Sequence, residues 1–185
     1  MSLSELQPNT LPVPTDDGTA NHLAGITLPH LTLGATNGNL VDIGAIAGLV
    51  VLYIYPMTGR PDTPLPDGWD VMPGARGCTP QACSFRDHFA ELQSLNTEVY
   101  GLSAQTTEYQ LEAKQRLHFP FELLSDPALQ LKSVLKIPTF TAAEMELYKR
   151  LTLIARDGHV QKVFYPVFPP ERNADEVLSW LRENA

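Results

Sequence analysis

The stretch "GCTPQACSFRD", residues 77–87, contains both cysteines of this 185-residue chain. Cys78 and Cys83 are five positions apart in a segment whose apolar residues follow a helical spacing. Pro80 suits the first turn of a helix, because a residue without a backbone N–H loses no hydrogen bond there. We therefore expect a helix that begins near Pro80 and brings both thiols into one functional segment.

Cys78 is a candidate nucleophile because of its place at the start of this helix. Unpaired backbone N–H groups and the positive end of the helix dipole meet there, and both favour a thiolate over a thiol. Arg76 and Arg86 lie close by in the sequence and are further sources of positive charge. The plain alternative is an inert buried thiol, since cysteine is among the most buried residue types.

The spacing of Cys78 and Cys83 constrains what the two thiols can do. On an ideal helix their Cα atoms would be roughly 8 to 9 Å apart, whereas a disulfide needs less than about 7 Å. A bond between them therefore implies that the first turn or two of the helix unwinds, which couples oxidation to local unfolding. Alternatively, Cys83 is a small core residue beside Phe85.

The segment before this helix predicts a buried strand and then a long loop. "GLVVLYIYP", residues 48–56, is β-branched and aromatic, and it is too short to cross a membrane. Residues 57–77 contain four prolines and four glycines, which exclude a regular helix or a central strand. Long loops in compact domains are usually functional or mobile. Trp69 in this loop is a candidate lid over the site, or a contact to a partner subunit.

Strands and helices alternate along the rest of the chain. Apolar patterns and caps predict strands over Ile26–Leu33, Leu40–Ile43, Glu98–Ser103, Phe121–Leu124, Arg150–Ala155 and Val160–Tyr165, and helices from Thr106 or Thr107 to Leu117, over Ala128–Leu135 and from Asn173 onward. This order predicts an α/β fold of three layers, in which helices flank a central mixed β-sheet. We expect residues 1–22 to form a flexible N-terminal arm and residues 23–185 a single domain.

Composition and charge limit the partners. The formal net charge of −8 argues against nucleic acid and anionic membranes. The N-terminus has no pattern of a secretory signal, so we expect a cytoplasmic protein, in which two cysteines indicate redox or catalytic work rather than a structural bridge. The histidines are scattered, without a second ligand at short spacing, so we expect no metal and no cofactor.

The strand, the loop and the cysteine-containing helix together resemble the peroxiredoxins, specifically the Q-type branch, which is also called bacterioferritin comigratory protein. The resemblance rests on "VVLYIYP" and "GCTPQACSFRD" and continues through "VYGLSAQTTEYQLEAKQRLHFPFELLSDP" and "KRLTLIARDGHV", so that it covers residues 24–184. It implies a thioredoxin-like fold and the reduction of hydroperoxides by a peroxidatic cysteine. Cys78 matches that cysteine, and Cys83 stands at the position of the resolving cysteine.

The resemblance also implies a peroxide-binding site. Pro56 matches the active-site proline of the family, and Arg150 matches an arginine from a later strand. Gly77 and Thr79 flank the nucleophile and are expected to contact the substrate. The blander alternative for Arg150 is a surface charge that follows Lys149.

One feature of the family is missing. The Thr or Ser that usually stands three residues before the cysteine is replaced by Ala75, and the loop before Cys78 is longer than the compact loop of the family. Thr58 or Thr79 could supply the missing hydroxyl, or a backbone N–H could serve instead. The departure concerns the binding of the peroxide and not the nucleophile.

These observations predict a thiol peroxidase for hydrogen peroxide and organic hydroperoxides. A thiolate would become a sulfenic acid and then an intramolecular disulfide, and thioredoxin or a glutaredoxin would restore both thiols. One alternative is a redox sensor that passes its disulfide to a partner. Another is a thiol–disulfide exchange protein, against which the absence of Cys-x-x-Cys counts. The oligomeric state is left open between monomer and homodimer.

Overall fold

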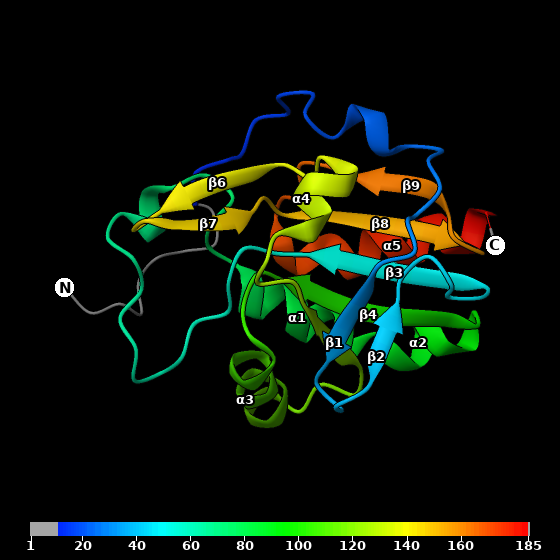
Figure 1. The fold of residues 1–185 in the computed structure, drawn as a ribbon, viewed down its shortest axis with the longest axis horizontal. Helices are drawn as coiled ribbons and strands as arrows, with labels where there is room; N and C mark the ends of the chain where they lie inside the picture. The colour runs from blue at the N-terminus through cyan, green and yellow to red at the C-terminus, as the bar shows by residue number, and fades with distance from the viewer. Residues whose placement is uncertain (1–10, 185) are drawn as a thin grey trace.

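The computed structural model describes residues 11–184, and its main sheet has seven strands in the order β2-β1-β5-β4-β3-β8-β9. The strands are β1 (Thr32–Ala35), β2 (Leu40–Asp42), β3 (Leu49–Ile54), β4 (Thr97–Ser103), β5 (Glu122–Ser125), β8 (Leu151–Arg156) and β9 (His159–Phe164). β3, β4 and β5 run parallel to one another, whereas β8 is antiparallel to β3 (Figure 1). The prediction of a mixed sheet is confirmed.

Helices cover both faces of this sheet. They are α1 (Cys78–Asp87), α2 (Phe89–Ser94), α3 (Thr107–Leu117), α4 (Gln130–Leu135) and α5 (Asn173–Asn184), with 3-10 turns η2 (Asn21–Leu23), η3 (Trp69–Val71) and η4 (Pro170–Arg172). Figure 1 shows α4 in front of the sheet and α1, α2 and α5 behind it. The predicted three-layer α/β architecture is therefore confirmed.

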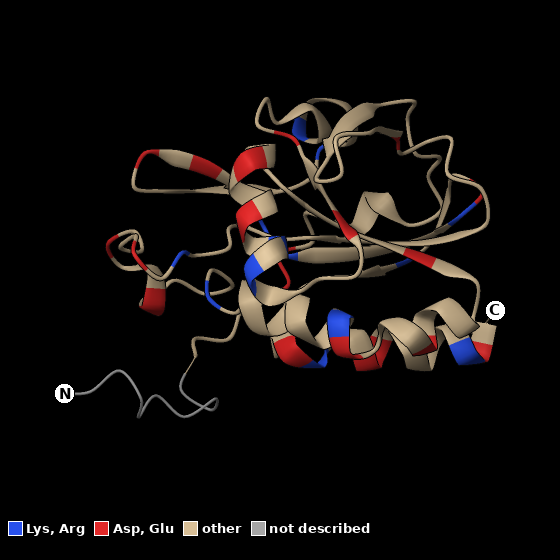
Figure 2. Cartoon of the chain, turned by 90° about the horizontal axis from the view of Figure 1, so that it is seen from below, with Lys and Arg blue, Asp and Glu red and all other residues tan. Residues whose placement is uncertain are grey.

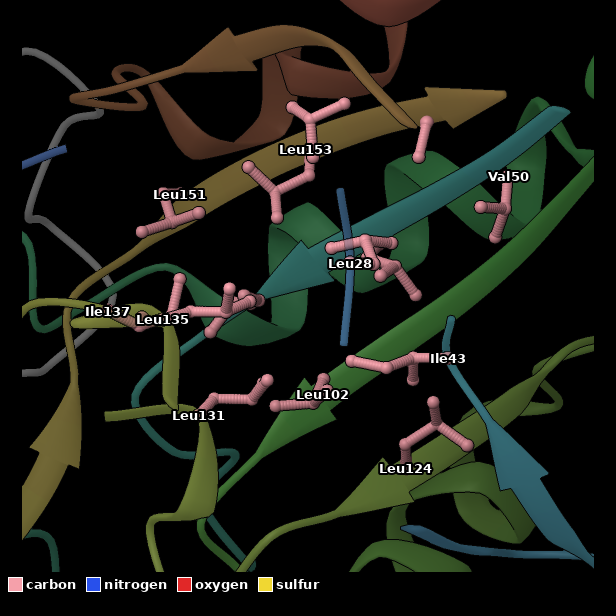
Figure 3. Close-up of a cluster of buried hydrophobic side chains, with 14 of the residues drawn as sticks. Leu28, Ile43, Val50, Leu102, Leu124, Leu131, Leu135, Ile137, Leu151 and Leu153 are labelled. Carbon is pink, nitrogen blue, oxygen red and sulfur yellow. The ribbon is translucent and has the colours of Figure 1, made fainter. Parts of the chain in front are cut away.

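The core lies on the two faces of β3, whose six residues are all buried. In front, leucine, isoleucine and valine side chains of β3, β8 and α4 pack with those of residues 23–46 (Figure 3). Behind, a second cluster joins β3 to α1, α2 and α5, and it contains Cys78. The central strand β3 contains no charged residue, and most of the charged residues lie on helices and loops (Figure 2).

A β-hairpin that the sequence did not predict lies beside the main sheet. It consists of β6 (Thr139–Ala142) and β7 (Met145–Tyr148). Ala142 and Leu147 of the hairpin form a third buried cluster with Trp69 and Ala75 of the long loop. The hairpin therefore supports the loop that leads to Cys78.

One strand prediction is wrong at its start. The strand predicted over Ile26–Leu33 begins only at Thr32, and before it Thr27 forms an isolated bridge with His159. The helix expected near Pro80, with Cys78 in its first turn, begins at Cys78, and it ends before His88, which separates α1 from α2. The imidazole of His88 lies 2.8 Å from a carboxylate oxygen of Glu91 and 3.1 Å from one of Asp175 on α5.

The predicted N-terminal arm lies partly within the described residues, while residues 1–10 are outside them. Ala20 is buried, and the Asp17 carboxylate accepts hydrogen bonds from Lys149 Nζ (2.7 Å) and from the Tyr165 hydroxyl (2.8 Å). Within residues 11–184, no helix is both long and apolar enough to cross a membrane. The same part of the chain contains no group of three or more His, Cys, Asp and Glu side chains that could hold a metal ion.

Candidate active site

The turn before α1 is built around Gly77, the residue that caps the helix. Gly77 has a φ of 108°, a left-handed conformation that side-chain-bearing residues rarely adopt. A Cβ at this position would lie 2.5 Å from Cγ of Pro170 in η4. Glycine is therefore required here, and η4 packs directly against the start of the helix.

Cys78 is the first residue of α1, and only 5% of its surface is exposed. Its Sγ lies 3.7 Å from the carbonyl oxygen of Ala75 and 3.2 Å from Nη2 of Arg150. Arg150 directly precedes β8 and is 3% exposed, so it is not the surface charge of the alternative interpretation. A buried guanidinium and a helix N-terminus together place positive charge beside this sulfur.

The Arg150 guanidinium is held by several acceptors. Nη2 also donates to the carbonyl oxygens of Ala75 (3.2 Å) and Arg76 (3.1 Å), and Nη1 donates to Oε1 of Gln81. The loop backbone and α1 thus fix the position of the positive charge beside the sulfur.

A chain of buried hydrogen bonds continues from Gln81 to the start of α5. Gln81 Nε2 donates to Asn173 Oδ1 (3.0 Å), and the Thr152 hydroxyl donates to the same oxygen (2.7 Å). All three residues are fully buried. Sequence reasoning missed them: Gln81 is three positions after Cys78 in α1, which was a usable signal, but Asn173 is 92 positions from Gln81 and gave none.

Cys83 occupies a different environment on the same helix. It is half-buried against the cluster behind the sheet, and both cysteines are free thiols. Burial raises the pKa of the Cys83 thiol, and the nearby Arg86 guanidinium partly opposes this rise. Cys83 is therefore a protonated thiol at neutral pH.

A cavity of about 430 Å³ opens beside Cys78. Gly77 and Thr79 line it next to the sulfur. Most of the remaining lining comes from the long loop and from two neighbouring segments: Met57, Gly59, Arg60, Pro61, Leu65, Trp69 and Arg76, with Leu11, Pro80, Arg116 and Glu171. Trp69 is 4% exposed, and its ring centroid lies 6.2 Å from that of Phe140 on β6.

Pro56 and Thr58 lie outside the lining of this cavity. Both are buried, and the backbone of Thr58 is bound by the side-chain amide of Gln105 at 2.9 and 3.1 Å. Within residues 11–184, no hydrogen bond joins the hydroxyl of Thr58 or Thr79 to Cys78 Sγ. The structure therefore brings together Cys78, Arg150, Gly77 and Thr79, and the assignment of Pro56 and Thr58 to substrate binding stays a prediction.

Comparison with known proteins shows the family of the chain. The redoxin family model matches residues 23–178. The chloroplastic peroxiredoxin Q of Sedum lineare is 30% identical over 162 residues, which cover 85% of this chain and 77% of the relative. The peroxiredoxin bcp1 of Schizosaccharomyces pombe is 33% identical over 130 residues, covering 68% of this chain and 58% of the relative. The chain thus spans between 58% and 77% of the length of these two relatives.

Solved structures share the fold. The peroxidoxin BcpB of Mycobacterium tuberculosis superimposes with a TM-score of 0.71 at 23% identity, over 88% of this chain and 97% of the other. A cysteine-to-serine variant of PrxQ from Xylella fastidiosa superimposes with a TM-score of 0.70 at 20% identity, over 86% and 95%. The thioredoxin-like fold is confirmed, and the chain belongs to the redoxin family, within its Q-type branch of peroxiredoxins, which are thiol-dependent peroxidases.

Proposed function

We propose that this chain reduces hydrogen peroxide and organic hydroperoxides with Cys78 as the nucleophile. The observation that carries the proposal is the distance of 3.2 Å between Arg150 Nη2 and Cys78 Sγ, at a sulfur that borders the cavity. A cation buried beside a helix-start cysteine is the environment that reactive thiolates need. The lining of the cavity leaves room for a substrate at this sulfur.

The first step is an attack of the Cys78 thiolate on the terminal peroxide oxygen. An S–O bond forms, the O–O bond breaks, and the leaving alkoxide or hydroxide takes a proton to become an alcohol or water. Negative charge spreads over the sulfur and both oxygens in the transition state. Arg150 and the backbone N–H groups at the start of α1 are placed to stabilise that charge as it develops.

The second step joins the two cysteines. The Cys83 thiol attacks the sulfenic acid of Cys78, so that a disulfide forms and water leaves. Both residues lie within the helical span of α1, where their Cα atoms are roughly 8 to 9 Å apart, so the start of the helix has to unwind first. A dithiol reductant, thioredoxin or a glutaredoxin, then reduces the disulfide by exchange.

The lining of the cavity supports organic hydroperoxides among the substrates. Met57, Leu65 and Trp69 place apolar surface beside the sulfur. Gly77 and Thr79 line the cavity next to Cys78, and we assign them to substrate binding. Substrate binding by Pro56 and Thr58, which follow β3 where the long loop begins, stays part of the proposal.

The remaining assignments are also proposals. We place residues 23–185 in one domain, and we propose a cytoplasmic protein that acts as a monomer or homodimer. Size-exclusion chromatography with light scattering of the reduced and the oxidised chain would decide between these two states.

The deciding experiment is peroxide consumption with a thioredoxin system, together with mass spectrometry of the two cysteines. Cys78→Ser is expected to abolish consumption. Cys83→Ser is expected to keep the formation of the Cys78 sulfenic acid and to lose the disulfide. A chain that becomes oxidised by one equivalent of peroxide but does not turn over would instead favour the redox sensor.

A further inference from the structure

The buried hydrogen bonds behind Arg150 extend further than the reaction itself requires. Asn173 of α5 and Thr152 of β8 are fully buried; in the described part of the chain neither forms a hydrogen bond with Cys78 Sγ or lines the cavity. Burying polar side chains costs free energy unless their hydrogen bonds are satisfied. These hydrogen bonds link α1, β8 and α5 through buried polar side chains, and we therefore expect them to have a role at the site.

The Arg150 guanidinium determines the donor and acceptor roles in the series of hydrogen bonds through Gln81 to Asn173. A guanidinium can only donate hydrogen bonds, so Gln81 has to turn Oε1 toward Arg150 and its Nε2 away. Asn173 therefore has to present Oδ1 to Gln81, and Thr152 donates to that same oxygen. The Nδ2 group of Asn173 is buried and finds no partner within residues 11–184. Asn173 Oδ1 is thus the single acceptor that fixes the orientation of the Gln81 side chain.

The segment that ends at Asn173 contacts α1 a second time. Pro170 of η4 packs against Gly77, the residue before Cys78, and Asn173 binds the residue three positions after Cys78. These two contacts bracket the first turn of α1. The junction of η4 and α5 therefore holds the turn that contains the reacting sulfur.

We propose that Asn173 is a positioning residue: its Oδ1 holds Gln81, and Gln81 in turn holds the Arg150 guanidinium against Cys78 Sγ. The inference rests on the proposed function in one respect, that Cys78 is the reacting thiol. Asn173 acts through Gln81 and does not touch the substrate. When α1 unwinds to let Cys83 reach Cys78, the hydrogen bond between Gln81 and Asn173 has to break.

The test replaces Asn173 with leucine in a Cys83→Ser background, so that Cys78 is the only thiol. The main readout is the rate of alkylation of Cys78 by iodoacetamide as a function of pH. We expect Asn173→Leu to displace this profile to higher pH and to slow the reaction with hydrogen peroxide by about tenfold, because the guanidinium loses its fixed position. Hydrogen exchange in the first turn of α1 is expected to become faster.

The alkylation profile near neutral pH reports on Cys78 because the neighbouring tyrosines do not titrate there. Besides Arg150, Tyr53 of β3 and Tyr55 just after it are titratable side chains that interact electrostatically with Cys78. Burial, together with the charge of nearby groups, raises the pKa of Tyr53, and burial raises that of Tyr55. Neither phenol titrates in this range.

Leu178→Ala is the matched control for stability. Leu178 is buried in the same helix as Asn173 and packs into the cluster behind the sheet. We expect it to lower the free energy of unfolding without moving the alkylation profile. If Asn173→Leu also leaves the profile in place and only lowers stability, Asn173 is merely structural and the proposal is overturned.

Two milder variants keep the test decisive if Asn173→Leu does not fold. Asn173→Asp retains the accepting oxygen, so we expect normal protection of α1, but its negative charge near the guanidinium should displace the profile to higher pH. Thr152→Val removes one of the two donors to Oδ1 and should displace it less. Unchanged profiles in both would contradict the proposal. A wild-type chain that shows these shifts but consumes no peroxide would overturn the proposed function alone.

Discussion

The inner and outer sides of the site around Cys78 are built in different ways. The inner side, formed by α1, Arg150 and the start of α5, is buried and joined by hydrogen bonds through Gln81 and Asn173. The outer side, formed by residues 57–76, consists of apolar side chains and arginines that pack on the β6–β7 hairpin or remain partly exposed. From this contrast we expect the rate of the proposed reaction and the choice of peroxide to depend on separate segments of the chain.

Removing the charge of the inner side should have the largest effect. Arg150→Met is expected to slow sulfenic acid formation by about a hundredfold or more for every peroxide, because one charge-stabilising donor is lost. Stopped-flow measurement of Cys78 oxidation checks this. The matched control on the outer side is Arg76→Met, which removes a half-exposed guanidinium paired with Asp70 at 2.8 Å. A few-fold loss is expected there, and equal losses in both variants would break the comparison.

A methyl group added to the inner side should cost stability. Gly77→Ala has to accept a left-handed backbone and an overlap with Pro170, so we expect a loss of about 2 kcal/mol in the free energy of unfolding. Urea denaturation measures this loss. Gly68→Ala on the outer side has a similar backbone, with a φ of 76° but no atom within 4 Å of the new Cβ. A loss as large in Gly68→Ala would mean that the contact with Pro170 contributes nothing.

Opening the outer side should change which peroxides react. Trp69→Ala removes apolar surface from the cavity, so we expect kcat/KM for a bulky apolar hydroperoxide such as cumene hydroperoxide to fall by about fivefold to tenfold, in line with the transfer free energy of part of an aromatic side chain. The value for hydrogen peroxide should change by less than about twofold, because a small substrate buries little of that surface. Equal losses for both peroxides would show that Trp69 supports the site as a whole.

The ion pair between Asp17 and Lys149 should have the smallest effect. The hydrogen bond from Lys149 holds the pKa of the Asp17 carboxyl well below its usual range. A lowered pKa in the folded state gives stability that is present at neutral pH and is lost as the pH falls below about 4. Asp17→Asn should therefore lower the free energy of unfolding at pH 7 by about 0.5 kcal/mol, a typical value for an exposed pair. Chemical denaturation at pH 7 and near pH 2 checks whether this difference shrinks, and a constant difference would exclude the ion pair as its source.

Local signals predicted much of the fold. The hydroxyl of Thr106 caps α3 as expected, and α5 begins at Asn173. The buried β3 was visible as an apolar run. Cys78 at the start of a helix followed from its sequence neighbours alone. These features depend on residues only a few positions apart.

Features that depend on distant or unusual backbone contacts were not visible. The β6–β7 hairpin turns at Ala143 and Glu144, with φ values of 46° and 64°, where a turn signal would have required Gly, Asn or Asp. Gln81 and Asn173 meet only through the tertiary fold. Trp69 was expected to be a lid or a partner contact; it lines the cavity, but it is buried against the hairpin.

On the proposed mechanism, the interruption of the helix at His88 would limit how much backbone takes part in the redox cycle. α1 is ten residues long and ends just before His88, whose imidazole contacts Glu91 on α2 and Asp175 on α5. Unwinding of α1 from Cys78 would therefore end at His88, which is not helical and whose side chain is bound by residues of α2 and α5. On the proposed mechanism the unwinding would stop before α2, so each redox cycle would reorganise only a short peptide while the rest of the domain keeps its shape.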